Sequence, residues 1–175
     1  TVWNGAQDAG WKNTGRGTVA VVYDKALEKN ILRMEAQTVY DWFPEGQPAY
    51  AHYMNFGRMQ AFLPIEREDW RGYNRITFRI RPNYAARKHV TCIAAVVNDG
   101  ETKVPDIYHR EGYHVINLLN DEWNTVQWEF PDLPRDCVTG IYLYAFLSGD
   151  NGACGTQIRY DFESICLEQI AEPER

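Results

Sequence analysis

Alternation of apolar and polar residues, repeated along the chain, constrains the fold of this sequence more than any other feature. Residues 75–81 read Arg-Ile-Thr-Phe-Arg-Ile-Arg, and segments 125–130 and 158–163 alternate in the same way. Successive side chains of a β-strand point to opposite faces, so this period of two predicts strands with one core face and one solvent face.

About ten such segments occur, and clusters of Gly, Pro, Asn, Asp and Ser separate them. Helical periodicity is confined to two short stretches, 24–29 and 65–70. The pattern predicts an all-β fold, a two-sheet antiparallel β-sandwich of jelly-roll type, with residues 1–175 forming a single domain. Residues 168–175 resemble a strand that runs into a linker, so we expect this domain to be excised from a larger modular protein. We expect strands at 18–23, 30–39, 49–56, 59–63, 74–81, 90–98, 113–118, 125–130, 139–147 and 157–169.

Composition narrows the classes of partner. The net charge is -6 and the isoelectric point is near 5.2, so the chain lacks the basic surface that nucleic acids or anionic membranes select. Apolar runs such as 92–97 are too short to span a bilayer. We expect a soluble monomer that binds neither nucleic acid nor membrane.

The four cysteines, Cys92, Cys137, Cys154 and Cys166, follow no zinc-ligand spacing. Cys92 and Cys166 lie in apolar strand-like runs, where a free cysteine behaves as a small hydrophobic residue. Buried free thiols and one or two disulfides both remain open from the sequence.

One outer sheet face is predicted to be charged. Alternation places Arg79, Arg81, Glu129, Asp161 and Glu163 away from the core. Cross-strand ion pairs on such a face contribute modestly, on the order of 0.2–1 kcal/mol each. We therefore expect a solvated face that mainly stabilises the sheet.

The other outer face is predicted to be aromatic. In the strand 140–146, Tyr142 and Tyr144 alternate with an aliphatic row, and Tyr50 and His52 alternate in the same way near residue 50. A face lined with Tyr and His is suited to ligand binding, because sugar rings pack on aromatic faces while hydroxyl groups bind polar side chains. The alternative is that these tyrosines cover the sandwich beneath a loop.

Loop residues give a second set of candidates. Trp42 lies beside Pro44 in a turn, and Arg110 follows an aromatic and a histidine in segment 108–113. Loop aromatics serve binding more often than core aromatics do, although Trp42 could equally act as a lid over the core. The remaining tryptophans are assigned mainly to packing: Trp3, Trp11, Trp70, Trp123 and Trp128.

Four stretches resemble the β-jelly-roll carbohydrate-binding modules attached to microbial polysaccharide-degrading enzymes, which share the galactose-binding-like topology. They are 15–34, 73–81, the Trp-Asn-Thr-Val strand entry at 123–128 and the closing strand at 160–167. The resemblance covers most of the chain, and each motif in it is structural.

The resemblance implies a non-catalytic module that binds a polysaccharide or oligosaccharide and targets a covalently linked glycan-active enzyme to plant or other complex polysaccharide. It also implies a secreted, cell-surface or periplasmic bacterial protein. No cofactor is required. The family can bind a structural calcium ion, for which Asp161, Glu163 and Asp24 are the candidate ligands, although Glu163-Ser164 stands where the family usually has paired Asp.

Two other functions remain open. A non-catalytic spacer or interaction domain would keep the fold and expose an apolar patch. A jelly-roll polysaccharide lyase would carry an Arg-rich strand with a partnered Gln-x-His triplet, and only the arginines of 75–81 match, although His52, His109 and Tyr113 could serve as acid or base. We therefore expect no catalytic residues.

Overall fold

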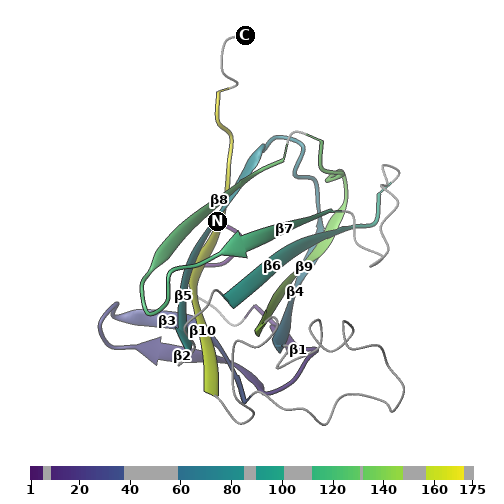
Figure 1. Cartoon of the computed structure of the whole chain (residues 1–175). Helices are drawn as coiled ribbons and strands as arrows, with labels where there is room; N and C mark the ends of the chain where they lie inside the picture. The colour runs from purple at the N-terminus through teal and green to yellow at the C-terminus, as the bar shows by residue number, and fades with distance from the viewer. Residues whose placement is uncertain are drawn as a thin grey trace, which may run out of the picture.

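The computed structural model describes residues 1–5, 9–37, 59–84, 90–100, 112–130, 132–147 and 157–171. Within these ranges the chain forms ten β-strands and no helix (Figure 1). The strands are β1 (Lys12–Asn13), β2 (Thr18–Asp24), β3 (Lys29–Gln37), β4 (Met59–Glu68), β5 (Arg75–Tyr84), β6 (Val90–Asn98), β7 (Gly112–Asn117), β8 (Asn124–Glu129), β9 (Val138–Leu147) and β10 (Gln157–Glu168). No helix in the described ranges could cross a membrane.

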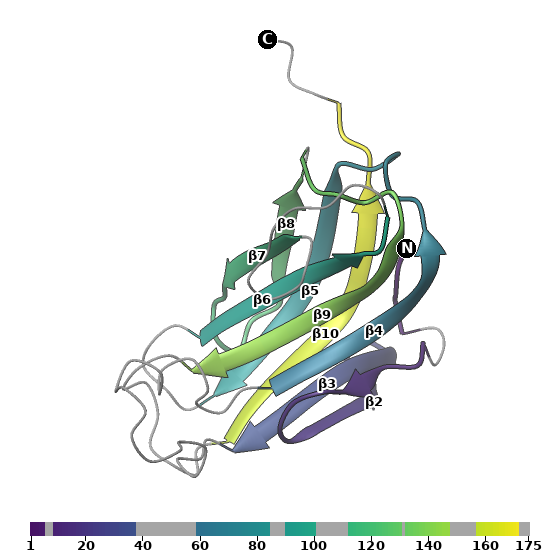
Figure 2. The ribbon, with the colours of Figure 1, turned by 90° about the vertical axis from the view of Figure 1, so that its right-hand side faces the viewer.

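The strands form two five-stranded sheets in which all paired neighbours are antiparallel. Sheet 1 has the order β2-β3-β10-β5-β8, and sheet 2 has the order β1-β4-β9-β6-β7. Figure 2 looks onto the outer face of sheet 2, with sheet 1 behind it. The predicted two-sheet antiparallel β-sandwich is confirmed.

The core lies between the two sheets and is built from the inward half of each alternating strand. Sheet 1 contributes Leu32, Met34, Ile76, Phe78, Ile80, Tyr160 and Phe162, and sheet 2 contributes Met59, Ala61, Leu63, Ala94, Val96, Ile141 and Leu143. Complete burial of a side chain as large as Phe78 stabilises the fold by roughly 1.5–3 kcal/mol. The core therefore fixes which residues face outward on each sheet.

The connection into β2 depends on glycine. Gly17 has a φ of 73°, and a Cβ atom there would lie 1.9 Å from the carbonyl oxygen of Glu35. The Asn13 side chain closes this turn, since its Nδ2 donates to the Gly17 carbonyl at 2.8 Å. Only glycine combines this conformation with such a close approach of β3.

The helical turns expected at 24–29 and 65–70 do not form. Residues 25–28 form the turn of the β2–β3 hairpin, where the Asp24 carboxylate accepts hydrogen bonds from the backbone N–H groups of Ala26 and Leu27. Residues 65–68 continue β4, with an irregular register between Pro64 and Glu68. At 24–28 the Asp24 side chain stabilises a hairpin turn in place of a helix, and at 65–68 the chain remains part of the sheet.

The other predicted strands agree with the structure to within a few residues, except for 49–56, which lies outside the described residues. Cys137 and Cys166 are half-buried free thiols. Neither of these two cysteines forms a disulfide.

Candidate functional site

The outer face of sheet 2 carries an aromatic row made of Phe62, Tyr142 and Tyr144. Alternation along β9 buries Ile141 and Leu143 in the core, which directs Tyr142 and Tyr144 to the outer face. Phe62 of β4 lies opposite Tyr142 in the antiparallel register and reaches the same face.

The three rings pack on one another. The ring centroids of Phe62 and Tyr142 are 4.5 Å apart with an interplanar angle of 40°. Tyr142 and Tyr144 are stacked, with centroids 5.6 Å apart and an angle of 21°. Such contacts stabilise by about 0.5–1.5 kcal/mol beyond the buried area, so each ring limits the orientation of the next.

Gly140 makes room for the first ring of the aromatic row. It lies two residues before Tyr142 on β9, opposite Pro64 of β4. A Cβ atom on Gly140 would lie 2.2 Å from the Cε2 atom of the Phe62 ring. Phe62 therefore lies directly over the β9 backbone, and any side chain at Gly140 would displace it.

Exposure differs along the aromatic row. Phe62 and Tyr142 are half-buried, whereas Tyr144 is only 4% exposed. The rings of Tyr142 and Phe62 therefore have surface that a ligand can contact. The Tyr144 ring stacks on the Tyr142 ring and limits its orientation. Both tyrosines belong to the expected binding face, but the Tyr144 ring is nearly enclosed and offers a ligand less surface than the Tyr142 ring.

Polar and small residues border the row. Gln60 of β4 is paired with Tyr144, and Lys12 of β1 is paired with Phe62. On the other side, Ala95 of β6 is paired with Tyr142 and is 1% exposed. Hydrogen-bonding groups thus lie along the β1 side of the row.

Sequence reasoning placed Tyr142 and Tyr144 on this outer face and missed Phe62, and the role of the two tyrosines in binding stays a prediction. The signal was available, because Met59, Ala61 and Leu63 alternate with Gln60 and Phe62. The other candidate binding residues, Tyr50, His52, Trp42 and Arg110, lie outside the described residues, so their role stays a prediction.

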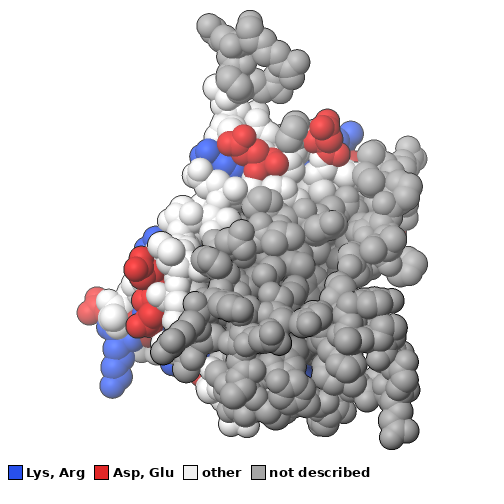
Figure 3. Space-filling view, viewed as in Figure 1, with Lys and Arg blue, Asp and Glu red and all other residues white. Residues whose placement is uncertain are grey.

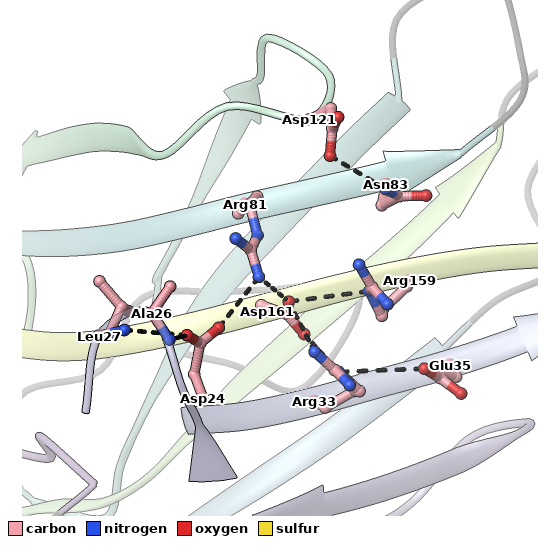
Figure 4. A network of polar contacts seen from close by, with 10 residues as sticks. All are labelled: Asp24, Ala26, Leu27, Arg33, Glu35, Arg81, Asn83, Asp121, Arg159 and Asp161. Carbon is pink, nitrogen blue, oxygen red and sulfur yellow. Dashed lines mark hydrogen bonds and ion pairs between the residues drawn. The ribbon is translucent and has the colours of Figure 1, made fainter. Parts of the chain in front are cut away.

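The outer face of sheet 1 carries the predicted charges, but one of them is fully enclosed. Asp161 of β10 is 0% exposed. Arg33 of β3 donates to its Oδ1 through Nε at 2.8 Å and to its Oδ2 through Nη2 at 3.2 Å. Arg81 of β5 donates to Oδ2 through Nη2 at 2.9 Å, as Figure 4 shows. Three strands are thereby joined across one carboxylate.

The same guanidinium reaches the β2–β3 hairpin. Nη2 of Arg81 also donates to Oδ2 of Asp24 at 3.2 Å. The hydrogen bond from the Leu27 backbone N–H is the main cause that lowers the pKa of Asp24. The hydrogen bond to Asp161 likewise raises the pKa of Arg33. Charged side chains over the hairpin lie at the left margin of Figure 3.

Trp123 belongs to this charged face. Its ring centroid is 4.7 Å from Cζ of Arg81 and 5.8 Å from Cζ of Arg79. Asn124 orders the preceding turn by donating to the carbonyls of Leu119 and Glu122. Besides the packing role expected for it, Trp123 therefore makes a cation–π contact that the sequence did not indicate.

The three candidate calcium ligands do not fit a metal site. Asp161 and Asp24 are bound by the arginines just described, and Glu163 accepts a hydrogen bond from Arg79 at 3.1 Å and pairs with Lys29 at 3.5 Å. Calcium needs several free oxygen ligands, and cations already occupy these carboxylates. Among the described residues no group of three or more His, Cys, Asp or Glu is placed to hold a metal.

Neither a family model nor a curated protein matches this sequence. Among solved structures, the chain is similar to a family 11 carbohydrate-binding module from Clostridium thermocellum, solved with a β-1,3-1,4-mixed-linked tetrasaccharide. The identity is 14% over 97% of this chain and 95% of that chain, with a TM-score of 0.58.

It is also similar to a family 28 carbohydrate-binding module specific for non-crystalline cellulose, with 14% identity, 95% and 94% coverage and a TM-score of 0.59. A third likeness is to the glycoside hydrolase domain of Endo-D from Streptococcus pneumoniae. There the identity is 9%, the TM-score is 0.51, and the match covers 93% of this chain and 22% of that one. At such low identities the likeness in structure establishes the fold alone, which is the β-sandwich that jelly-roll carbohydrate-binding modules share.

Proposed function

We propose that this chain is a non-catalytic carbohydrate-binding module that binds a polysaccharide or oligosaccharide through the aromatic row of sheet 2. The observation that carries the proposal is the fixed stack of Phe62, Tyr142 and Tyr144 on an outer sheet face. The C–H face of a pyranose packs on such rings, and the neighbouring Gln60 amide and the Tyr142 hydroxyl match sugar hydroxyls.

The fold neighbours support this class of ligand. The family 11 module was solved with a mixed-linked tetrasaccharide, and the family 28 module is described as specific for non-crystalline cellulose. Both likenesses cover nearly all of this chain. β-Linked glucans are therefore the first ligands to test.

Targeting of a linked enzyme completes the proposal. The match to Endo-D, in which a sandwich like this one accounts for 22% of a longer glycoside hydrolase chain, supports a modular context. We infer that the chain is a monomeric part of a secreted, cell-surface or periplasmic bacterial enzyme.

The ion pairs of sheet 1 favour binding over catalysis. Glycoside hydrolysis needs a pair of carboxylates flanking the scissile bond, one of them a proton donor. Asp161, Glu163 and Asp24 are each held by arginine or lysine. Carboxylates already paired with guanidinium or ammonium groups are not free to flank a scissile bond.

Affinity electrophoresis and calorimetric titration with mixed-linked β-glucan and soluble cellulose derivatives test the proposal. Tyr142→Ala and Phe62→Ala should each weaken binding at least about tenfold, which corresponds to about 1.4 kcal/mol. Tyr23→Ala is the matched control, because Tyr23 is 62% exposed on β2 of sheet 1. New reducing or unsaturated ends would instead identify an enzyme, and wild-type affinity in both test variants would exclude the aromatic row.

A further inference from the structure

Lys12 of β1 is an exposed cation at one end of the aromatic row. In the antiparallel register it lies opposite Phe62, and directly opposed residues share one face of a sheet. Its side chain therefore belongs to the outer face of sheet 2, and both residues of β1 are exposed. Among the described residues Lys12 forms no ion pair, whereas Lys29 on sheet 1 pairs with Glu163 at 3.5 Å. The ammonium group of Lys12 is thus accessible to a ligand.

The backbone that carries Lys12 is held on both sides. The preceding residue, Trp11, packs against the core. The following residue but one, Thr14, donates its backbone N–H to the carbonyl of Gln60 at 3.0 Å. A Cβ atom on Gly15 would lie 2.6 Å from the backbone nitrogen of Gln60, so this turn lies directly against β4. The position of the lysine relative to the row is therefore set before a ligand binds, which reduces the entropy lost on binding.

The described surroundings of Lys12 leave its charge without compensation. The residues next to Phe62 on the outward side of β4 are Gln60 and Pro64, which are uncharged. The first acidic residue of β4 is Glu66, four residues from Phe62 and roughly 13 Å away along an extended strand. Charges further apart than about 8 Å are largely screened at physiological ionic strength. This end of the row therefore has a local positive charge, although the net charge of the chain is -6.

The spacing between β1 and β4 matches the size of a sugar ring. The Cβ atoms of opposed residues on paired strands are about 4.5–5.5 Å apart. A pyranose whose C–H face packs on Phe62 thus has one rim directed toward β1, within reach of the four-carbon stem of lysine. The carboxylate of a uronic acid, or a sulfate ester on the C6 hydroxyl, projects from such a rim. A neutral sugar offers only hydroxyl groups there.

We propose that the aromatic row and Lys12 together select a β-linked glycan that carries an isolated anionic group, the carboxylate of a uronic acid or a sulfate ester, beside the stacked sugar. This inference rests on the proposed function and names the ligand class of the same site. Ring stacking supplies most of the affinity and Lys12 supplies the preference, because a single exposed ion pair contributes modestly. An isolated acidic group fits better than a polyanion, which the negative charge of the whole chain repels.

The test is a calorimetric titration of the full chain with matched tetrasaccharides of β-1,4-linked glucose. One is neutral, one has a single glucuronic acid residue, and one has a single sulfate ester at C6. At low ionic strength the wild type should bind a charged probe about threefold to fivefold more tightly than the neutral probe. In about 1 M salt the preference should vanish while the neutral probe still binds. The charged probe with the higher affinity identifies the anionic group.

Substitution of the lysine connects the preference to this residue. Lys12→Gln should lower the affinity for the charged probes to that for the neutral probe, and Lys12→Glu should reverse the preference. Lys25→Gln is the matched control, because it removes the same charge from an exposed lysine in the β2–β3 turn of sheet 1. It should keep the preference. Tyr142→Ala should weaken the binding of all three probes.

The outcomes separate this inference from the proposed function. Equal affinity of the wild type for all three probes, or a preference that persists in Lys12→Gln, would overturn the inference while the proposed function stands. A preference lost equally in Lys25→Gln would show that net charge, and not the position of Lys12, is responsible. No saturable binding of any probe would overturn the inference and the proposed function together.

Discussion

The two outer faces of this sandwich obey the same alternation and have opposite chemistry. On sheet 2 the outward residues of β4 and β9 are rings that stack on one another. On sheet 1 the outward residues of β3, β5 and β10 are arginines and carboxylates that neutralise one another. Periodicity thus determines which residues point away from the core. The chemistry of those side chains determines whether a face is suited to a ligand or stabilises the fold.

The largest expected effect comes from the charged face. Asp161→Ala removes the carboxylate shared by Arg33 and Arg81 and leaves their guanidinium groups facing each other. Breaking a buried ion pair by removing one partner costs about 3–5 kcal/mol. Denaturant unfolding should therefore show a loss of about 3 kcal/mol.

The matched control is Asp69→Ala, which removes an exposed carboxylate whose pKa is lowered to about 2 mainly by its hydrogen bonds from the Arg71 side chain. This variant should leave the unfolding midpoint nearly unchanged. A small change in the free energy of unfolding for Asp161→Ala would mean that the ion pairs of Asp161 do not stabilise sheet 1.

The next effect concerns the aromatic face. Gly140→Ala places a methyl group in the space of the Phe62 ring, which overpacks the row and should cost about 1–3 kcal/mol. Glycan affinity should fall with it, because Phe62 must move. Gly72→Ala is the control, since nothing lies within 4 Å of a Cβ atom there. Unchanged affinity in Gly140→Ala would show that the position of Phe62 is irrelevant to binding.

Trp123→Ala tests whether the two outer faces act independently in stability and in binding. It removes the ring beneath Arg81 and should lower the free energy of unfolding by about 1–2 kcal/mol. β-Glucan binding should remain at the wild-type level, because the ring lies on the opposite sheet. Trp123→Phe should restore part of the stability. Loss of β-glucan affinity in a folded Trp123→Ala protein would contradict the separation.

The smallest effect is a pH dependence. The pKa of Asp24 lies below its ordinary value of 3.8, chiefly because of the hydrogen bond from Leu27. Its contribution to stability is therefore present above pH 3.8 and is lost as the pH falls through the lower, folded-state pKa. Asp24→Asn keeps an acceptor for the turn and removes the charge. The stability gap between wild type and variant, measured by denaturant unfolding, should narrow from pH 5 to pH 2. A stability difference that does not change with pH would show that the charge of Asp24 does not stabilise the fold.

Much of this structure could be predicted from alternation. The strands, the two-sheet sandwich and the outward placement of Tyr142 and Tyr144 follow from a period of two. So does the outward placement of the charged residues that form the ion pairs of Arg81 with Asp161 and of Arg79 with Glu163.

Alternation could not predict pairing across strands that are distant in the sequence. Phe62 joins Tyr142 only through the β4–β9 register, and Arg33 reaches Asp161 only because β3 lies beside β10. It also could not predict that an outward carboxylate is fully buried, because the enclosure of Asp161 depends on long arginine side chains from its neighbours. Nor could it predict that Tyr144 is nearly enclosed while Tyr142 is half-buried, since enclosure depends on packing in three dimensions.

The most direct test of the central claim is a map of the surface that a β-glucan contacts. A mixed-linked tetrasaccharide should be titrated into isotopically labelled protein, and backbone and aromatic chemical shifts should be followed. We predict the largest changes at Phe62, Tyr142 and Gln60 on sheet 2, with little change at Trp123 or Arg81. Shifts confined to the charged face of sheet 1, or no saturable shifts with any neutral β-glucan, would contradict the account.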